Sequence, residues 1–205
     1  SGELEARVVA PVPWTPPGSR LLGDYAHFQK IAPHEIRHGI DVMHPRYLLI
    51  PKFGMTLAPA TLYASLRGVF RNIIASGYDF DLIDAHYFYP DGVAAVLLGR
   101  MLNKPVVITA RGTDLNLIPE YALPRRQILW AARHASGIIT VCQALKDTLT
   151  GMGVPPESVR ALRNGVDLKR FYPMDRAAAR SELAIEGPTL LSVGHLIDRK
   201  GHDLI

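Results

Sequence analysis

Residues 82–110 of the chain read LIDAHYFYPDGVAAVLLGRMLNKPVVITA. The short apolar run at 82–86 predicts a strand, and the alanine-rich stretch at 91–102 predicts a helix whose small residues pack closely on a sheet. Four apolar or β-branched residues follow one another within 105–110, which predicts a second strand. A strand, a helix and a strand in this order predict two parallel strands joined by a crossover helix.

The same alternation continues toward the C-terminus. Residues 123–134 and 143–152 have the pattern of helices, whereas 137–141 and 159–162 have that of short buried strands. The sequence therefore predicts an α/β fold, a Rossmann-like parallel sheet with helices on both faces. Ligands of such sheets bind beyond the carboxyl ends of the strands. The candidate ligand-binding segments are therefore those that follow predicted strands: 13–20, 86–91, 111–114, Cys142, 164–167 and 194–200.

Three further elements are predicted before residue 82. Residues 4–12 have a short β-branched run that proline stops, which predicts a strand. Two extended pieces within 35–50 flank His38 and Gly39, which predicts a hairpin. Residues 57–76 carry apolar side chains at helical spacing and predict a helix with one apolar face.

The sheet pattern ends at Asn164 and Gly165, and a polar helix is expected at 175–184. The apolar run at 189–193 then predicts a buried strand, followed by Gly194 and a polar turn with Lys200. A glycine turn with a lysine at the mouth of a helix suits a phosphate, because backbone N–H groups converge beside a cation. A first strand and its turn cannot fold alone, so we expect the chain to end inside a second domain.

Composition narrows the classes of partner. The 205 residues are 48% hydrophobic and 20% charged, which is ordinary for a globular protein. The net charge is +4, but no basic run of five or more residues occurs, so we expect no nucleic-acid partner. An anionic ligand or an anionic membrane surface explains the basic excess equally well.

One cysteine, Cys142, excludes an intramolecular disulfide and favours a reducing compartment. We expect a cytoplasmic protein, either free or peripheral to the inner face of the membrane. A catalytic thiol needs a base and an electropositive setting. The sequence shows no such partner for Cys142, so we interpret it as a small residue that fills a tight space.

Two motifs follow strands, and each leaves alternatives open. His86 and Tyr87 begin an aromatic cluster that lines a sugar-binding cleft or else caps the core. Arg111 can bind phosphate or carboxylate bidentately. Alternatively, Arg111 forms an ion pair with Asp114, or Asp114 caps a following turn. Arg125 and Arg126, at a predicted helix start, either reach an anion or lie on a solvated helix face.

Five segments together carry a family resemblance: DAHY (84–87), TARGTD (109–114), VCQALK (141–146), RNGVDLKRFYP (163–173) and LSVGHLIDRKG (191–201). From about Val8 to its end, the chain resembles family 4 of the retaining, nucleotide-sugar-dependent glycosyltransferases. The resemblance implies the GT-B architecture, in which two Rossmann-like domains face each other across a cleft. The first domain holds mainly the acceptor, and the second holds mainly the nucleotide sugar.

The resemblance also implies a domain organisation. Residues 1–164 correspond to the acceptor-side domain, which lacks its first strand and helix. Residues 165–187 are the connection between domains. Residues 188–205 are the start of a truncated donor-binding domain, with the first strand of its sheet.

Residue roles are carried over by position in the family's motifs. Lys200 matches the lysine that binds the donor diphosphate, and Gly194 matches the glycine before it. Arg111 stands where the family usually has a histidine near the donor sugar, and His195 replaces an arginine that assists the lysine. The implied sets are catalytic Arg111 and Lys200; donor-binding Gly194, His195 and Lys200; and acceptor-binding His86, Tyr87, Asp114, Arg125 and Arg126.

The expected reaction moves a sugar from a nucleoside diphosphate sugar to a hydroxyl group, with retention, in cell-envelope polysaccharide synthesis. The acceptor is a sugar, a lipid-linked molecule or a small molecule. We expect no metal and no cofactor, because the nucleotide sugar is a substrate. The alternative is a non-catalytic sugar- or nucleotide-binding domain of the same fold, which the residues Arg111 and His195 favour.

Overall fold

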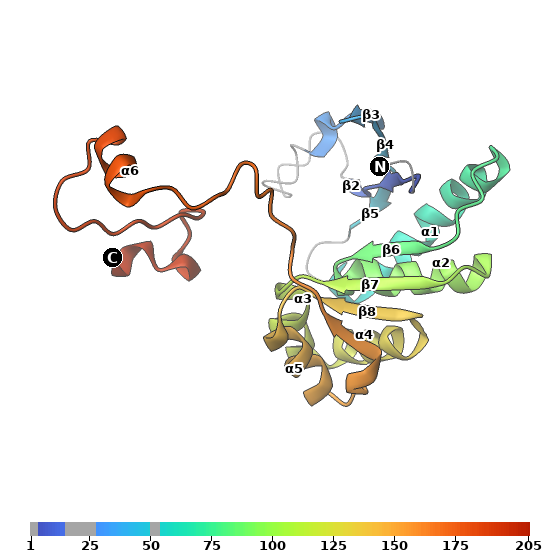
Figure 1. The fold of residues 1–205 in the computed structure, drawn as a ribbon. Coiled ribbons are helices and arrows are strands. Elements are labelled where there is room, and N and C mark those ends of the chain that lie inside the picture. The colour runs from blue at the N-terminus through green and yellow to red at the C-terminus, as the bar shows by residue number, and fades with distance from the viewer. Residues whose placement is uncertain (1–3, 15–27, 50–53) are drawn as a thin grey trace. The chain divides into compact units, whose positions relative to one another are not determined.

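The computed structural model describes residues 4–14, 28–49 and 54–205. The chain forms two units, Ser1–Asn164 and Gly165–Ile205, each of which is considered by itself (Figure 1). Most of the loop expected at 13–20 lies outside the described residues.

The first unit is built on a four-stranded parallel sheet in the order β6-β7-β8-β9. The strands are β6 (Ile83–His86), β7 (Val106–Ala110), β8 (Gly137–Thr140) and β9 (Val159–Ala161). Each neighbouring pair is parallel, and the register aligns His86 with Thr109. The α/β fold with a parallel sheet, predicted from the alternating pattern, is confirmed.

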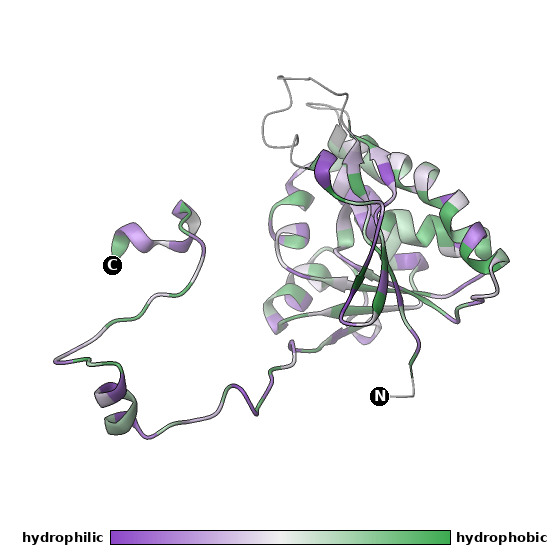
Figure 2. Ribbon diagram, turned by 90° about the horizontal axis from the view of Figure 1, so that it is seen from above, coloured by the Kyte–Doolittle hydropathy of each residue, from purple (hydrophilic) through white to green (hydrophobic). Residues whose placement is uncertain are grey.

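Helices α1 (Gly54–Ala75), α2 (Val93–Leu102), α4 (Ala122–His134) and α5 (Gln143–Gly151) cover one face of this sheet. The side chains of Ile83, Ile108 and Ile138 point toward them and join one buried core with residues from all four helices. Figure 2 shows hydrophobic residues along these strands and along the helices that cover them.

The opposite face is less covered, since Asp84, His86 and Arg160 are exposed and Val107 and Ile139 are only partly buried. Successive strands step in one direction across the sheet, and right-handed crossovers then place the connecting helices α2, α4 and α5 on the same side.

Two glycines set how closely α2 approaches the sheet. A Cβ atom added at Gly99 would lie 2.3 Å from Cγ2 of Val106, and one at Gly92 would lie 2.9 Å from Cγ2 of Ile108. Neither position has room for a side chain, so the backbone of α2 lies directly on β7, as the small residues of this helix predicted.

The N-terminal part contributes two small sheets. β1 (Arg7–Val9) pairs in parallel with β4 (Ile40–Met43), which pairs antiparallel with β3 (His34–Arg37). The predicted hairpin is therefore confirmed, with His38 and Gly39 both at positive φ in its turn. β2 (Val12–Trp14) pairs in parallel with β5 (Arg46–Leu48), so the single strand expected at 4–12 is divided between two sheets around Pro11.

In the second unit, helix α6 (Arg176–Glu182) begins where the carboxylate of Asp175 accepts a 2.8 Å hydrogen bond from the N–H of Ala178. Two short 3-10 helices follow, η5 (Asp198–Lys200) and η6 (His202–Leu204).

The strand predicted at 189–193 is wrong for this structure. Leu190, Leu191 and Val193 are each 87% exposed, and the segment has no regular secondary structure. A strand needs a neighbour to take its backbone hydrogen bonds, and no strand among the described residues pairs with this segment. Without such a neighbour, the apolar side chains find no core to enter.

Among the described residues, no helix is both long and apolar enough to cross a bilayer.

Candidate functional site

Two loops meet at the carboxyl ends of β6 and β7. The first contains the one-turn π-helix η2 (Phe88–Gly92), and the second contains the short helix α3 (Thr113–Asn116) and the 3-10 helix η3 (Ile118–Glu120). Because β6 and β7 are parallel neighbours, both loops leave the sheet at the same edge. We name this edge, with residues 86–92 and 111–117, the carboxyl edge.

Asp114 joins the two loops of the carboxyl edge. Its side chain is completely buried, and its carboxylate accepts hydrogen bonds from the backbone N–H groups of Phe88 and Gly112, both at 2.7 Å. It also accepts a bond of 3.1 Å from the N–H of Arg111. A buried charge is tolerated when backbone donors surround it in this way.

This arrangement corrects two expectations for Asp114. Its carboxylate pairs with no guanidinium, and it bonds N–H groups that precede it, so it does not cap the following turn. Asp114 has no exposed surface and positions the two loops. Its role toward an acceptor stays a prediction.

Gly112 is required for the conformation of the second loop. Its φ is +143°, in the region that favours glycine, and the space around its missing Cβ is empty. Glycine is therefore needed at this position for its backbone conformation and not for space.

Asp84, His86 and Arg111 form a row of charged and polar side chains on the less covered face. Nδ1 of His86 lies 3.2 Å from Nε and 2.5 Å from Nη2 of Arg111, and Nε2 of His86 lies 3.3 Å from Oδ2 of Asp84. The register explains this contact. His86 pairs with Thr109, and Arg111 lies two residues further along, on the same face as His86.

The aromatic cluster after β6 divides into two parts. Phe88 and Tyr89 are 0% and 2% exposed and belong to the core, as one of the two interpretations held. Burial raises the pKa of Tyr89 to about 12, and its hydroxyl group lies 2.9 Å from Oε1 of Gln127 in α4. Tyr87 is only partly buried and has a φ of +88°, which is a strained conformation for a tyrosine.

Asp91 is a residue that the sequence interpretation did not select. Burial raises the pKa of its carboxyl group to about 6, and the negative charge of Asp114 adds to the increase. A carboxylate between the aromatic cluster and the apolar start of α2 was the available signal in the sequence. Perturbed carboxyl groups of this kind concentrate at functional sites.

Arg125 and Arg126 lie near the start of α4 and are exposed, and neither forms an ion pair within the described ranges. Leu117, Tyr121 and Leu123, which precede them, are each more than half exposed. Cys142 is also exposed, so it fills no tight space. It lies at the surface because it occupies the bend between β8 and α5.

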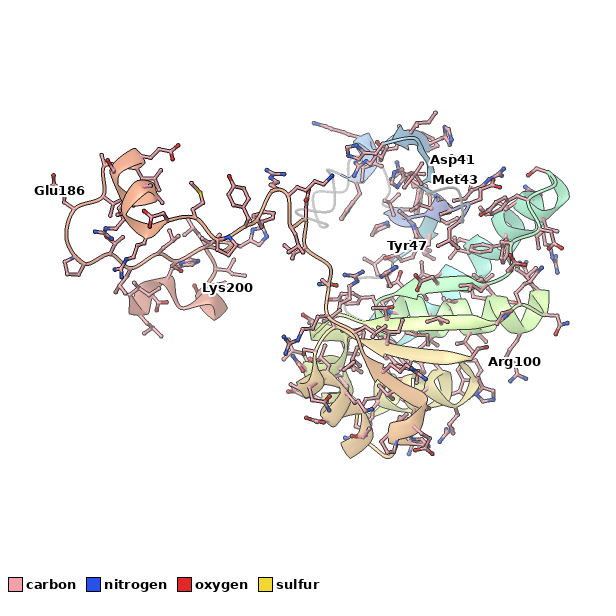
Figure 3. The ribbon with its side chains drawn as sticks, in the orientation of Figure 1. Asp41, Met43, Tyr47, Arg100, Glu186 and Lys200 are labelled. Atoms are coloured by element: carbon pink, nitrogen blue, oxygen red, sulfur yellow. The ribbon has the colours of Figure 1, made fainter. Side chains whose placement is uncertain are left out.

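The predicted donor-binding residues lie in the second unit, where Figure 3 labels Lys200. A Cβ atom added at Gly194 would lie 3.7 Å from Cγ of Lys200 and 3.5 Å from Nε2 of His202. The backbone oxygen of His195 lies 3.1 Å from the same His202 nitrogen. Gly194, His195 and Lys200 thus share one turn, and both His195 and Lys200 are exposed. Their role toward a donor stays a prediction.

No group of three or more His, Cys, Asp or Glu side chains among the described residues could hold a metal ion.

The known proteins that resemble this chain in sequence include several glycosyltransferases. TuaC of Bacillus subtilis (strain 168), a glycosyltransferase named for teichuronic acid biosynthesis, is 27% identical over 204 residues, which are 97% of this chain and 51% of TuaC. A D-inositol 3-phosphate glycosyltransferase of Saccharomonospora viridis is 29% identical over 162 residues, covering 72% of this chain and 37% of that protein. The chain thus spans about half the length, or less, of these relatives.

Among solved structures, Anabaena HepE (Alr3699) in complex with UDP matches 87% of this chain and 50% of its own, with a TM-score of 0.49 and 17% identity.

The family comparison covers most of the chain. The model of Glycosyltransferase Family 4 matches residues 3–170, which include nearly all of the first unit. The motifs that carry the resemblance at 84–87, 109–114 and 141–146 lie inside this match, as does the carboxyl edge. On this evidence, the chain belongs to Glycosyltransferase Family 4.

Proposed function

We propose that the protein to which this chain belongs transfers a sugar from a nucleoside diphosphate sugar to an acceptor hydroxyl group, with retention at the anomeric carbon. The family match over residues 3–170 carries this proposal. In it, residues 1–164 are the acceptor-side domain, residues 165–187 are the connection between domains, and residues 188–205 are the start of a donor-binding domain. That the relatives are about twice as long as this chain supports the further proposal that the chain is part of a longer enzyme.

The chemistry assigned to the chain is positioning and charge stabilisation. Lys200 and the turn around Gly194 and His195 would bind the donor diphosphate, and Lys200 would offset the charge that develops on it as the sugar leaves. Arg111 supplies a permanent positive charge at the carboxyl edge, because a guanidinium does not lose its proton in a protein. Holding the acceptor hydroxyl against the anomeric carbon contributes the remainder through proximity.

The acceptor would lie against the partly buried Tyr87 and near Arg125 and Arg126. A sugar, a lipid-linked molecule and a small molecule each fit this proposal, and the name of TuaC supports a cell-envelope polysaccharide. Exposed Leu117, Tyr121 and Leu123 beside the exposed Arg125 and Arg126 support contact with an anionic membrane surface. We propose that the enzyme is cytoplasmic and makes this contact at the inner face of the membrane. The proposal requires neither a metal nor a cofactor.

The second candidate function is binding without catalysis. It is favoured by Arg111, which stands where the resemblance implies a histidine, and whose guanidinium is already engaged by His86. A protein of this class would bind the nucleotide sugar tightly without turnover.

The test is a transfer assay on the complete protein with a panel of nucleoside diphosphate sugars and sugar or lipid-linked acceptors. We expect a new glycosidic bond whose anomeric configuration, measured by NMR, equals that of the donor. An inverted product would contradict retention. Tight donor binding with no product would support the non-catalytic alternative and contradict the enzyme.

A further inference from the structure

We propose that Asp84 is a positioning residue, which fixes the tautomer and orientation of His86 so that His86 in turn holds the guanidinium of Arg111 at the carboxyl edge. The importance of this row for sugar transfer rests on the proposed function, but its geometry does not. The inference changes the role of His86 from a direct acceptor ligand to the support of Arg111.

The first step concerns the proton on the imidazole ring. Nδ1 of His86 faces Nε and Nη2 of Arg111, at 3.2 and 2.5 Å, and both of these groups can only donate hydrogen bonds. Nδ1 must therefore present its lone pair. A neutral histidine with a bare Nδ1 carries its proton on Nε2.

The second step concerns Asp84. Its Oδ2 lies 3.3 Å from Nε2 of His86, and an ionised carboxylate can only accept. Asp84 therefore selects the same tautomer that Arg111 requires. Because Asp84 and His86 are two residues apart on β6, the strand itself brings them to one face.

The third step is what the row does for Arg111. A free arginine side chain samples many rotamers, whereas two of its N–H groups directed at one ring nitrogen fix the plane of the guanidinium. The remaining N–H groups are left for an anionic ligand, such as a phosphate or a carboxylate. Asp114 contributes from the other side, because it binds the backbone N–H of Arg111.

The row contributes little to folding. The side chains of Asp84 and His86 are 52% and 51% exposed, and exposed ion pairs add little to stability. Replacing Asp84 should therefore leave the fold intact, so its effects on His86 and Arg111 can be measured directly.

The experiment is ¹⁵N NMR of the histidine rings in the 205-residue chain, with the His86 signals assigned by their loss in His86→Gln. We expect the Nε2–H tautomer in the wild type, a mixture of tautomers in Asp84→Ala, and the wild-type pattern in Asp84→Asn, whose amide oxygen still accepts. Asp41→Ala is the matched control, because Asp41 pairs with His34 on the hairpin and should leave His86 unchanged. An Nδ1–H tautomer in the wild type, or unchanged His86 signals in Asp84→Ala, would overturn the proposal.

Kinetics of the complete protein then test the link to transfer. In metal sites, removing a group that orients a ligand side chain lowers affinity or activity by about 10- to 100-fold. We expect kcat to fall about tenfold in Asp84→Ala, with rescue in Asp84→Asn. Wild-type kcat in Asp84→Ala would overturn the positioning role. A complete protein without transfer activity would contradict the proposed function instead, and the NMR result would still decide the geometry.

Discussion

Two segments of the chain have nearly the same sequence pattern and different structures. Residues 106–110 and 189–193 are both short apolar runs, and each is followed within two residues by a glycine. The first forms the inner strand β7, bonded to β6 and β8, with Ile108 and Ala110 completely buried. The second forms no strand, and its leucines are almost fully exposed. Strand propensity in an apolar run therefore becomes a strand only where neighbours complete its hydrogen bonds and cover its side chains.

Truncating one side chain in each segment tests whether the two segments differ in packing. Ile108→Ala should lower the free energy of unfolding of the first unit by about 4 kcal/mol, because it leaves a cavity in a packed core. Leu191→Ala should change it by less than about 0.5 kcal/mol, since exposed positions contribute little. Urea denaturation followed by circular dichroism measures both. Equal losses would show that 189–193 is packed as well as β7 is.

Asp114 and Asp175 both accept hydrogen bonds from backbone N–H groups, but Asp114 is buried and Asp175 is exposed. Asp114→Ala should lower the free energy of unfolding by about 3 kcal/mol, because the buried N–H group of Phe88 and the partly buried N–H groups of Arg111 and Gly112 lose their acceptor. Asp175→Ala, at the exposed start of α6, should cost no more than about 1 kcal/mol. The same denaturation series applies, with Asp114→Asn as the milder variant in case the alanine variant fails to fold. A loss below 1 kcal/mol for Asp114→Ala would argue against its role in joining the loops.

The contribution of Asp91 to the free energy of unfolding depends on pH. Its pKa rises from an ordinary 3.8 to about 6 on folding, so the folded state binds the proton more tightly than the unfolded state. The charged carboxylate therefore costs stability, and this cost develops as the pH rises from about 4 to 6 and stays constant above that. Asp91→Asn should stabilise the protein by up to about 3 kcal/mol at pH 8 and by almost nothing below pH 4.

Unfolding measured at both pH values decides this prediction. A gain that is the same at pH 8 and pH 3.5 would show that the asparagine acts through packing and not through the missing charge.

Much of the first unit could be predicted from its sequence. The strands around Ile108 and Ile138 follow from β-branched runs between turns, and the small residues of α2 predicted its close contact with β7. The order of strands in the sheet could not be predicted, because no local pattern encodes it.

The candidate site was less predictable. The position of Arg111 at the carboxyl edge followed from its place after a strand, but its contact with His86 depends on the register between β6 and β7. The function of Asp114 was missed because its partners are backbone N–H groups, which are the same in every sequence. Asp91 was missed because the burial that raises its pKa is a property of the folded chain.

The central claim is that Arg111 serves sugar transfer at the carboxyl edge. The most direct measurement is kcat of the complete protein for Arg111→Ala, with Arg160→Ala as control, because Arg160 is an exposed arginine on β9 of the same sheet. We predict that Arg111→Ala lowers kcat by about 100-fold or more, as expected when a charge that stabilises the transition state is lost, and that Arg160→Ala leaves it unchanged. Wild-type kcat in Arg111→Ala would contradict the account.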